Sequence, residues 1–264
     1  MTDEHDAPEA ETRSIELEQE VAAPPDEVWE VLTSGEGLKS WFPLDARVTP
    51  GVGGSVWLSW GPGMEGQAPI HVWEPSKRFG WTESHGEDAA GRPIVVTVDF
   101  HVEGRAGTTV VRLVQSGLGA SSDWDAMYDS LKDGWTYFLF NLAYYLLKHR
   151  GASRKMVWRR VATDLARDVA WDKLVAGGLV AIAPAGADGV QIELDQARPA
   201  QVASTRTGHH FAATLPDLDD SVFFVELEGS HIGFWLSTYG VDDDRVAELQ
   251  QALDERVEGA LGSG

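Results

Sequence analysis

Residues Asp123–Leu147 read DWDAMYDSLKDGWTYFLFNLAYYLL, and this stretch decides the fold. Its large apolar residues recur at steps of three and four: Met127, Leu131, Trp135, Phe138, Leu142 and Tyr145. That spacing predicts one long amphipathic helix, with Asp123 as its N-cap. Glycine within a helix costs about 1 kcal/mol against alanine. Gly134 therefore indicates that another element approaches the helix backbone closely.

The residues before this helix have the pattern of strands. Apolar and polar residues alternate over Ile94–Glu103 and over Ile15–Val21, which predicts half-buried strands. Pro24 and Pro25 stop the first strand and open a short helix. Turn signals then divide the chain into further antiparallel strands. The order of elements predicts an α+β helix-grip fold, in which a curved antiparallel sheet wraps around the long helix that follows it.

The second half of the chain repeats this order with weak residue identity. RDVAWDKL at 167–174 is similar to DEVWEVL at 26–32, and Asp242–Leu261 predicts a capped amphipathic helix. We therefore expect two tandem copies, the second degenerate, with a boundary near Gly151–Ser153. The expected domains are a disordered acidic tail at 1–13, a helix-grip domain at 14–151 and a degenerate copy at 152–264.

Composition limits the classes of partner. The chain has 264 residues and a formal net charge of -21, which repels phosphate backbones and predicts no nucleic-acid partner. Its longest apolar stretch is shorter than the ~20 residues of a membrane helix, so we expect no membrane insertion. The N-terminus lacks the apolar core of a signal peptide, and we expect a cytoplasmic protein. The chain has no cysteine, which excludes disulfides and thiolate metal sites.

The first half resembles a known family at several short motifs. They are AAPPDEVW at 22–29 after the first strand, the Trp-containing turn at Leu38–Phe42, Gly53-Gly54 before a strand, WEPSKRF at 73–79 and Gly134-Trp135 on the long helix. Their order is similar to that of the START-like (SRPBCC) superfamily, in the branch named for homology to the activator of the heat-shock chaperone ATPase. The resemblance covers about Ser14–Arg150. It implies a helix-grip fold with an interior cavity, apolar ligands in many members, and no shared catalytic residues.

The candidate ligand site follows from the expected geometry. A strongly bent sheet cannot touch one straight helix along its whole length, so a gap remains between them. The residues expected to line this gap are Trp41, Phe42, Trp57, Trp60, Trp81, Phe100, Gln115, Tyr128, Trp135 and Phe138. Aromatic rings with a few polar groups are typical of a small-molecule pocket. Any one of these aromatic residues could equally be an ordinary core residue.

Catalytic and metal signals are weak. Glu83 is in phase with Phe79 and Trp81, so it could point inward, with a raised pKa, as an acid or base. A strand-end carboxylate that reaches solvent is the simpler interpretation. The adjacent His209 and His210 point to opposite faces of a strand and cannot readily share a metal. We expect no cofactor and no metal site.

Three functions are compatible with these patterns. We favour a module, and not an enzyme, that binds a hydrophobic or aromatic small molecule in an internal cavity. The alternatives are a cyclase or hydrolase that uses a cavity carboxylate such as Glu83, and a protein-interaction module similar to a chaperone cofactor. A protein partner or a homodimer is also compatible with the sequence. The sequence does not identify the ligand.

Overall fold

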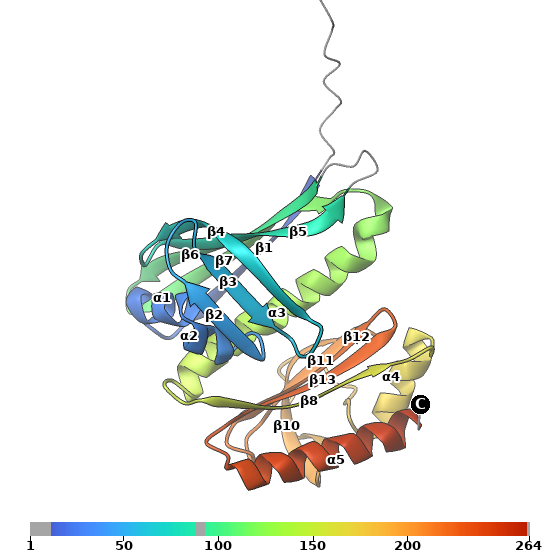
Figure 1. Cartoon of the computed structure of the whole chain (residues 1–264). Coiled ribbons are helices and arrows are strands. Elements are labelled where there is room, and N and C mark those ends of the chain that lie inside the picture. Colours follow the sequence, from blue (N-terminus) through green and yellow to red (C-terminus); the bar gives the residue numbers. More distant parts are fainter. Residues whose placement is uncertain (1–11, 88–92, 263–264) are drawn as a thin grey trace, which may run out of the picture. The chain divides into compact units, whose positions relative to one another are not determined.

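The computed structural model describes residues 12–87 and 93–262, and these residues group into two compact units. One unit contains the chain up to Glu36 together with Asp45–Trp135, and the other contains Gly37–Leu44 together with the chain from Thr136. Each unit holds one antiparallel sheet (Figure 1). The expected α+β fold, with two antiparallel sheets that are each followed by a helix, is confirmed. Most of the expected acidic tail lies outside the described residues.

The first unit has a 7-stranded sheet in the order β1-β7-β6-β5-β4-β3-β2. Its strands are β1 (Thr12–Val21), β2 (Asp45–Thr49), β3 (Ser55–Ser59), β4 (Glu65–Glu74), β5 (Arg78–Glu87), β6 (Pro93–Arg105) and β7 (Thr108–Gly119). The first strand begins at Thr12, two residues before the expected start. Helix α1 (Pro25–Thr33) follows it, with Pro25 in the first turn, and α2 (Gly35–Lys39) is the next element.

The register of the strands places one row of side chains across the inner face of this sheet. It runs through β1, β7, β6, β5 and β4 as Ile15, Gln115, Val98, Trp81 and Ile70. All five are buried. Gln115 is the only polar member of this row, so its amide needs a partner from another layer.

The long helix α3 runs from Asp125 to Lys148, after a short 3₁₀ turn, η1 (Ser122–Trp124). Its first part, up to Trp135, belongs to the first unit, and the rest groups with the second unit. The boundary that we expect near Gly151–Ser153 lies between α3 and the next strand. No helix within residues 12–87 and 93–262 is long and apolar enough to cross a membrane.

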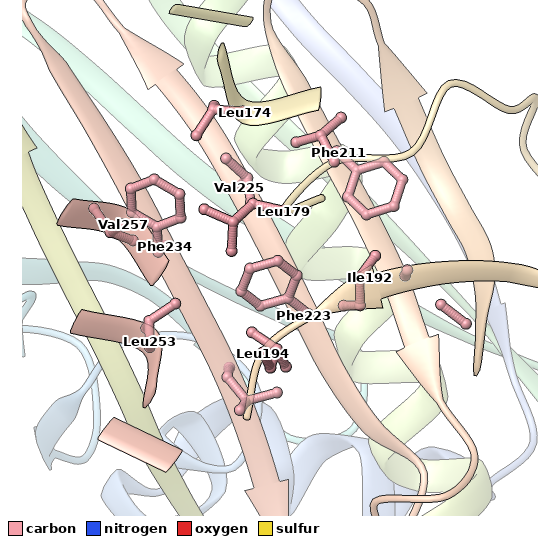
Figure 2. Packing of buried hydrophobic residues seen from close by; sticks show 14 of the residues in the cluster. Leu174, Leu179, Ile192, Leu194, Phe211, Phe223, Val225, Phe234, Leu253 and Val257 are labelled. Atoms are coloured by element: carbon pink, nitrogen blue, oxygen red, sulfur yellow. The ribbon is translucent and has the colours of Figure 1, made fainter. Parts of the chain in front are cut away.

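The second unit has a 6-stranded sheet in the order β8-β13-β12-β11-β10-β9. The strands are β8 (Arg154–Ala162), β9 (Val190–Glu193), β10 (Ala197–Arg206), β11 (His210–Leu215), β12 (Ser221–Glu228) and β13 (His231–Tyr239), and the helices are α4 (Arg167–Ala176) and α5 (Asp243–Leu261). Leucine, isoleucine, valine and phenylalanine side chains fill the space between one sheet face and these helices (Figure 2). Asp242 caps α5 by accepting a hydrogen bond from the Arg245 backbone N–H at 2.8 Å, as the sequence indicates.

The other face of this second sheet packs against the second part of α3. Tyr137 stacks on Phe224 with a centroid distance of 3.8 Å and an interplanar angle of 4°. The segment Gly37–Leu44 belongs to the same unit, and its backbone carbonyls are held by buried side chains. Asn141 donates to the Trp41 carbonyl at 2.6 Å, and Tyr239 donates to the Ser40 carbonyl at 2.8 Å.

The second unit also contains a buried group of ion pairs and a side chain that binds the backbone of its edge strand. Arg198, almost fully buried, pairs with Asp195 and Asp217, and Asp195 also pairs with Arg245 of α5. At the edge strand β8, the Gln250 side chain accepts from the Trp158 backbone N–H at 3.1 Å and donates to the Trp158 carbonyl at 3.0 Å. The amide of Gln250 therefore occupies backbone groups that an added strand would use.

Candidate functional site

Four of the predicted ligand residues meet at the inner face of the first sheet: Trp81, Phe100, Gln115 and Trp135. Trp135 of α3 packs edge-on against Phe100 at 5.8 Å, and Phe100 lies 5.7 Å from Trp81. The Trp135 Nε1–H donates to Gln115 Oε1 at 2.9 Å. Trp135 of the helix is therefore the polar partner of Gln115, and this hydrogen bond joins the helix to the sheet.

Tyr128 lies on the same side of α3 as Trp135, because seven residues make two helical turns. The two residues are about 10 Å apart along the helix at 1.5 Å per residue. The Tyr128 hydroxyl donates to the Ser14 carbonyl of β1 at 3.1 Å. Tyr128 is half-buried, and Met127 beside it is 45% exposed. This end of the interface between sheet and helix is therefore more accessible than the end at Trp135.

The other predicted residues lie elsewhere. Trp57 shares a sheet face with its pairing partners Arg47 and Gln67, opposite to the face of buried Val56, and the Arg47 guanidinium lies 4.4 Å from its ring centroid. The prediction that Trp57 lines the inner face is therefore wrong. Trp60 directly follows β3, and its backbone N–H donates to the Met64 carbonyl at 3.0 Å.

Three further predicted residues belong to the second unit. Phe42 stacks on Trp41 at 5.2 Å and meets Phe138 edge-on at 4.8 Å. Trp41 is fully buried. Phe42 therefore lies between the other two rings, and these contacts are those of core residues.

Glu83 of β5 lies beside Trp81 and His85, and its carboxylate is bound by both. Its carboxylate accepts from Trp81 Nε1 at 2.8 Å and pairs with His85 Nε2 at 3.1 Å. Burial alone would raise the pKa of Glu83, but the hydrogen bonds from His85 and Trp81 outweigh it and lower the pKa. The hydrogen bond to Glu83 raises the pKa of His85. The raised pKa that the sequence allowed for an inward Glu83 is therefore not found, since the carboxylate is stabilised in its charged form.

Arg13 is a site residue that sequence reasoning missed, because it was assigned to the acidic tail. It lies in β1 in phase with buried Ile15 and Val21, so it faces α3. Its Nη1 pairs with Asp125 at 2.8 Å, and its guanidinium carbon lies 4.3 Å from the Tyr128 ring centroid. The alternation of inward and outward residues in β1 extends to Arg13, and this was the available sequence signal.

A polar cluster lies on the opposite face of the sheet. Asp99 of β6 accepts from Arg78 at 2.9 Å and bonds to His71 Nε2 at 3.1 Å, while His71 Nδ1 contacts the Thr82 hydroxyl at 3.1 Å. A Cβ at Gly80 would lie 2.7 Å from Asp99 Oδ1, so glycine leaves room for the carboxylate. The cluster joins β4, β5 and β6. Among residues 12–87 and 93–262, no group of three His, Cys, Asp or Glu residues could hold a metal ion.

One family model and several solved structures are similar to this chain. Residues 22–146 match the family model described as Activator of Hsp90 ATPase homolog 1-like protein. Protein MLL2253 from Mesorhizobium loti is similar at 25% identity, with 52% of this chain and 98% of that chain covered and a TM-score of 0.46. The Aha1 dimer from Colwellia psychrerythraea is similar at 21% identity, with 51% and 96% covered and a TM-score of 0.44. DynU16, from the dynemicin biosynthetic locus, is 19% identical over 94% of this chain and 96% of its own, with a TM-score of 0.43. No curated protein matches the chain.

Proposed function

Because residues 22–146 belong to the family of Activator of Hsp90 ATPase homolog 1-like proteins, we propose that the first unit binds an apolar or aromatic small molecule. The ligand lies between the sheet and the first part of α3. One observation carries the proposal: exposure rises along this interface. Trp81 and Phe100 are fully buried, whereas Tyr128 and Leu131 are half-buried and Met127 is exposed. Apolar side chains that remain accessible beside a closed aromatic end suit an apolar ligand.

A few polar groups stand ready to orient such a ligand. Gln115 supplies an amide within the buried row, and Glu83 with His85 supplies a partly exposed hydrogen-bonded pair on β5. A small number of placed polar groups in an apolar surround is typical of small-molecule sites. The net charge of -21 supports the further proposal that nucleic acid is not a partner.

An acid–base enzyme receives less support. A general acid at neutral pH needs a carboxyl group whose pKa is raised towards 7. Glu83 has a lowered pKa and is held by two hydrogen bonds. We therefore propose a binding module and not a cyclase or hydrolase that depends on Glu83.

The first experiment is native mass spectrometry of the gently purified protein, followed by a thermal-shift screen with apolar and aromatic compounds. A bound molecule should raise the melting temperature, because it binds only the folded state. Trp135→Phe should weaken the shift by removing the Nε1–H and part of the ring. The control Trp171→Phe alters a buried tryptophan of α4 in the second unit and should leave the ligand-dependent shift unchanged.

If no compound co-purifies and none raises the melting temperature, the binding function is refuted. A protein-interaction module would then be the next hypothesis. It would be examined by pull-down with substitutions at exposed apolar residues such as Met127 and Val95.

A further inference from the structure

We infer that the ligand of the first unit carries an oxyanion, a carboxylate or a sulfonate on an apolar body, and that Arg13 binds it in a bidentate manner. This inference rests on the proposed function and adds the chemical class of the ligand. It comes from the side chain of Arg13 and the two elements that hold it.

The Arg13 guanidinium is held on two sides, and its third edge has no hydrogen-bond partner in the described residues. Asp125 occupies Nη1 at 2.8 Å, and the Tyr128 ring covers one face at 4.3 Å. The remaining edge of the group presents Nε and Nη2. Both atoms are shielded from solvent, and no group in the described part of the chain accepts a hydrogen bond from either.

Unpaired donors of this kind need an acceptor. A buried N–H without a partner loses its hydration and gains nothing in return, and the cost is larger for a charged group. Nε and Nη2 point in parallel from one edge of a planar group, a geometry that matches the two oxygens of a carboxylate or sulfonate. A neutral hydroxyl or an amide offers one acceptor oxygen, whereas a carboxylate or sulfonate offers a separate oxygen to each donor. The edge is therefore shaped for an oxyanion.

The position of Arg13 relates this edge to the proposed ligand interface. Arg13 is in phase with Ile15, on the inner face of β1, and both of its partners lie on the first turns of α3. Trp135 lies on the same side of α3, about 10 Å along the helix from Tyr128. A molecule with its acidic group at Arg13 and an aromatic body of two fused rings would run along α3 towards Trp135.

Preference for an acidic ligand over its neutral analogue requires a local positive charge. The chain as a whole carries a net charge of -21 and repels anions at long range. Asp125 offsets part of the charge of Arg13, but its side chain is 63% exposed, so solvent weakens its influence. Close bidentate contact with Arg13 is consequently what favours an acid over its neutral analogue.

The test compares two fluorescent probes with nearly the same aromatic body. The first, 8-anilinonaphthalene-1-sulfonate, carries a sulfonate, and the second, N-phenyl-1-naphthylamine, does not. Both are titrated into the full-length wild type and into Arg13→Gln, Arg13→Lys and Arg47→Gln. Arg47 is the matched control, because it also lies over an aromatic ring, at 4.4 Å from the Trp57 ring centroid, and it pairs with the Asp45 carboxylate at 3.9 Å.

We expect Arg13→Gln to weaken the binding of the sulfonate probe about tenfold or more, because a charge-assisted bidentate pair is lost. The affinity for the neutral probe should change by less than about twofold, and this retained binding also reports that the variant is folded. Arg13→Lys should behave like Arg13→Gln, because an ammonium group lacks the fork. Arg47→Gln should alter neither probe. Millimolar acetate or inorganic phosphate should not displace the sulfonate probe, since these anions have no apolar body.

Other outcomes overturn the inference in distinguishable ways. If the neutral probe binds and Arg13→Gln affects both probes equally or neither, the oxyanion site is refuted while the binding function stands. If Arg13→Lys binds the sulfonate probe like the wild type, bidentate recognition is refuted. Displacement by simple anions would refute recognition of an organic acid. If neither probe binds the wild type, the proposed function fails, and this inference fails with it.

Discussion

Removing the Trp135 Nε1–H should destabilise the first unit by an amount that the structure allows us to estimate. Trp135 and Gln115 are both buried, 6% and 2% exposed, and their hydrogen bond is 2.9 Å long. Trp135→Phe keeps a ring beside Phe100 but leaves Gln115 Oε1 buried without that donor. Such an unsatisfied group costs about 1–3 kcal/mol. Gln115→Leu should cost a similar amount, because it leaves the Trp135 Nε1–H without an acceptor.

The double variant Trp135→Phe/Gln115→Leu provides the decisive comparison. Two apolar side chains leave no unsatisfied polar group, so its loss of stability should be smaller than the sum of the single losses by about 1–2 kcal/mol. Urea denaturation of the four proteins, followed by circular dichroism, measures this coupling. The losses of stability of Gln115→Leu and Trp171→Phe should be additive, because the two residues belong to different units. Additivity within about 0.3 kcal/mol for Trp135 and Gln115 would refute the reasoning.

Three further predictions concern charge and strand edges. Burial would raise the pKa of Asp195, but its bonds to two arginines lower it to about 2 from the ordinary 3.8, so its stabilisation is complete above pH 3.8 and is lost as pH falls towards 2. Asp195→Asn should remove that part of the acid dependence in urea titrations, and an unchanged profile would contradict it. Gln250→Ala should free the backbone of Trp158 at the edge of β8 and promote self-association in size-exclusion chromatography, whereas a monomer at all concentrations would argue against the edge role. Glu83→Gln should lower the pKa of His85 in an NMR titration, because the charged partner that raises it is lost, and an unshifted pKa would exclude the pair.

Periodic patterns in the sequence predicted the layers well. The three- and four-residue spacing from Met127 to Tyr145 marks α3, and the alternation of Ile94–Glu103 marks β6. These predictions succeed because burial on one side of an element imposes its period directly on the sequence. The phase of Trp57 could not be obtained in this way. Val56, Trp57 and Leu58 are consecutive and apolar, and the pairing of Trp57 with Arg47 and Gln67 decides which face it takes.

The polar part of the site was harder to predict than its aromatic part. Arg13 follows an acidic segment whose composition hides the start of β1, and only the contacts with Asp125 and Tyr128 identify its role. For Glu83 the sequence left the direction of the side chain open, and it did not determine the sign of the pKa shift. That sign depends on a balance between burial and hydrogen bonds. His85, two residues along the same strand face, was the sequence signal for the compensating partner.

The second half of the chain has the same order of elements, but close packing of its core disfavours a ligand there. Valine, leucine and phenylalanine side chains with no exposure, such as Leu174, Phe223 and Leu253, occupy the space between its sheet and its helices (Figure 2). A ligand there would have to displace close-packed side chains, which costs the contacts that stabilise the unit. The opposite face of the sheet is covered by Tyr137 and its aromatic neighbours. A sheet with apolar packing on both faces is suited to holding structure in place. Ligand-dependent changes should therefore be sought along the first part of α3, where apolar side chains remain accessible.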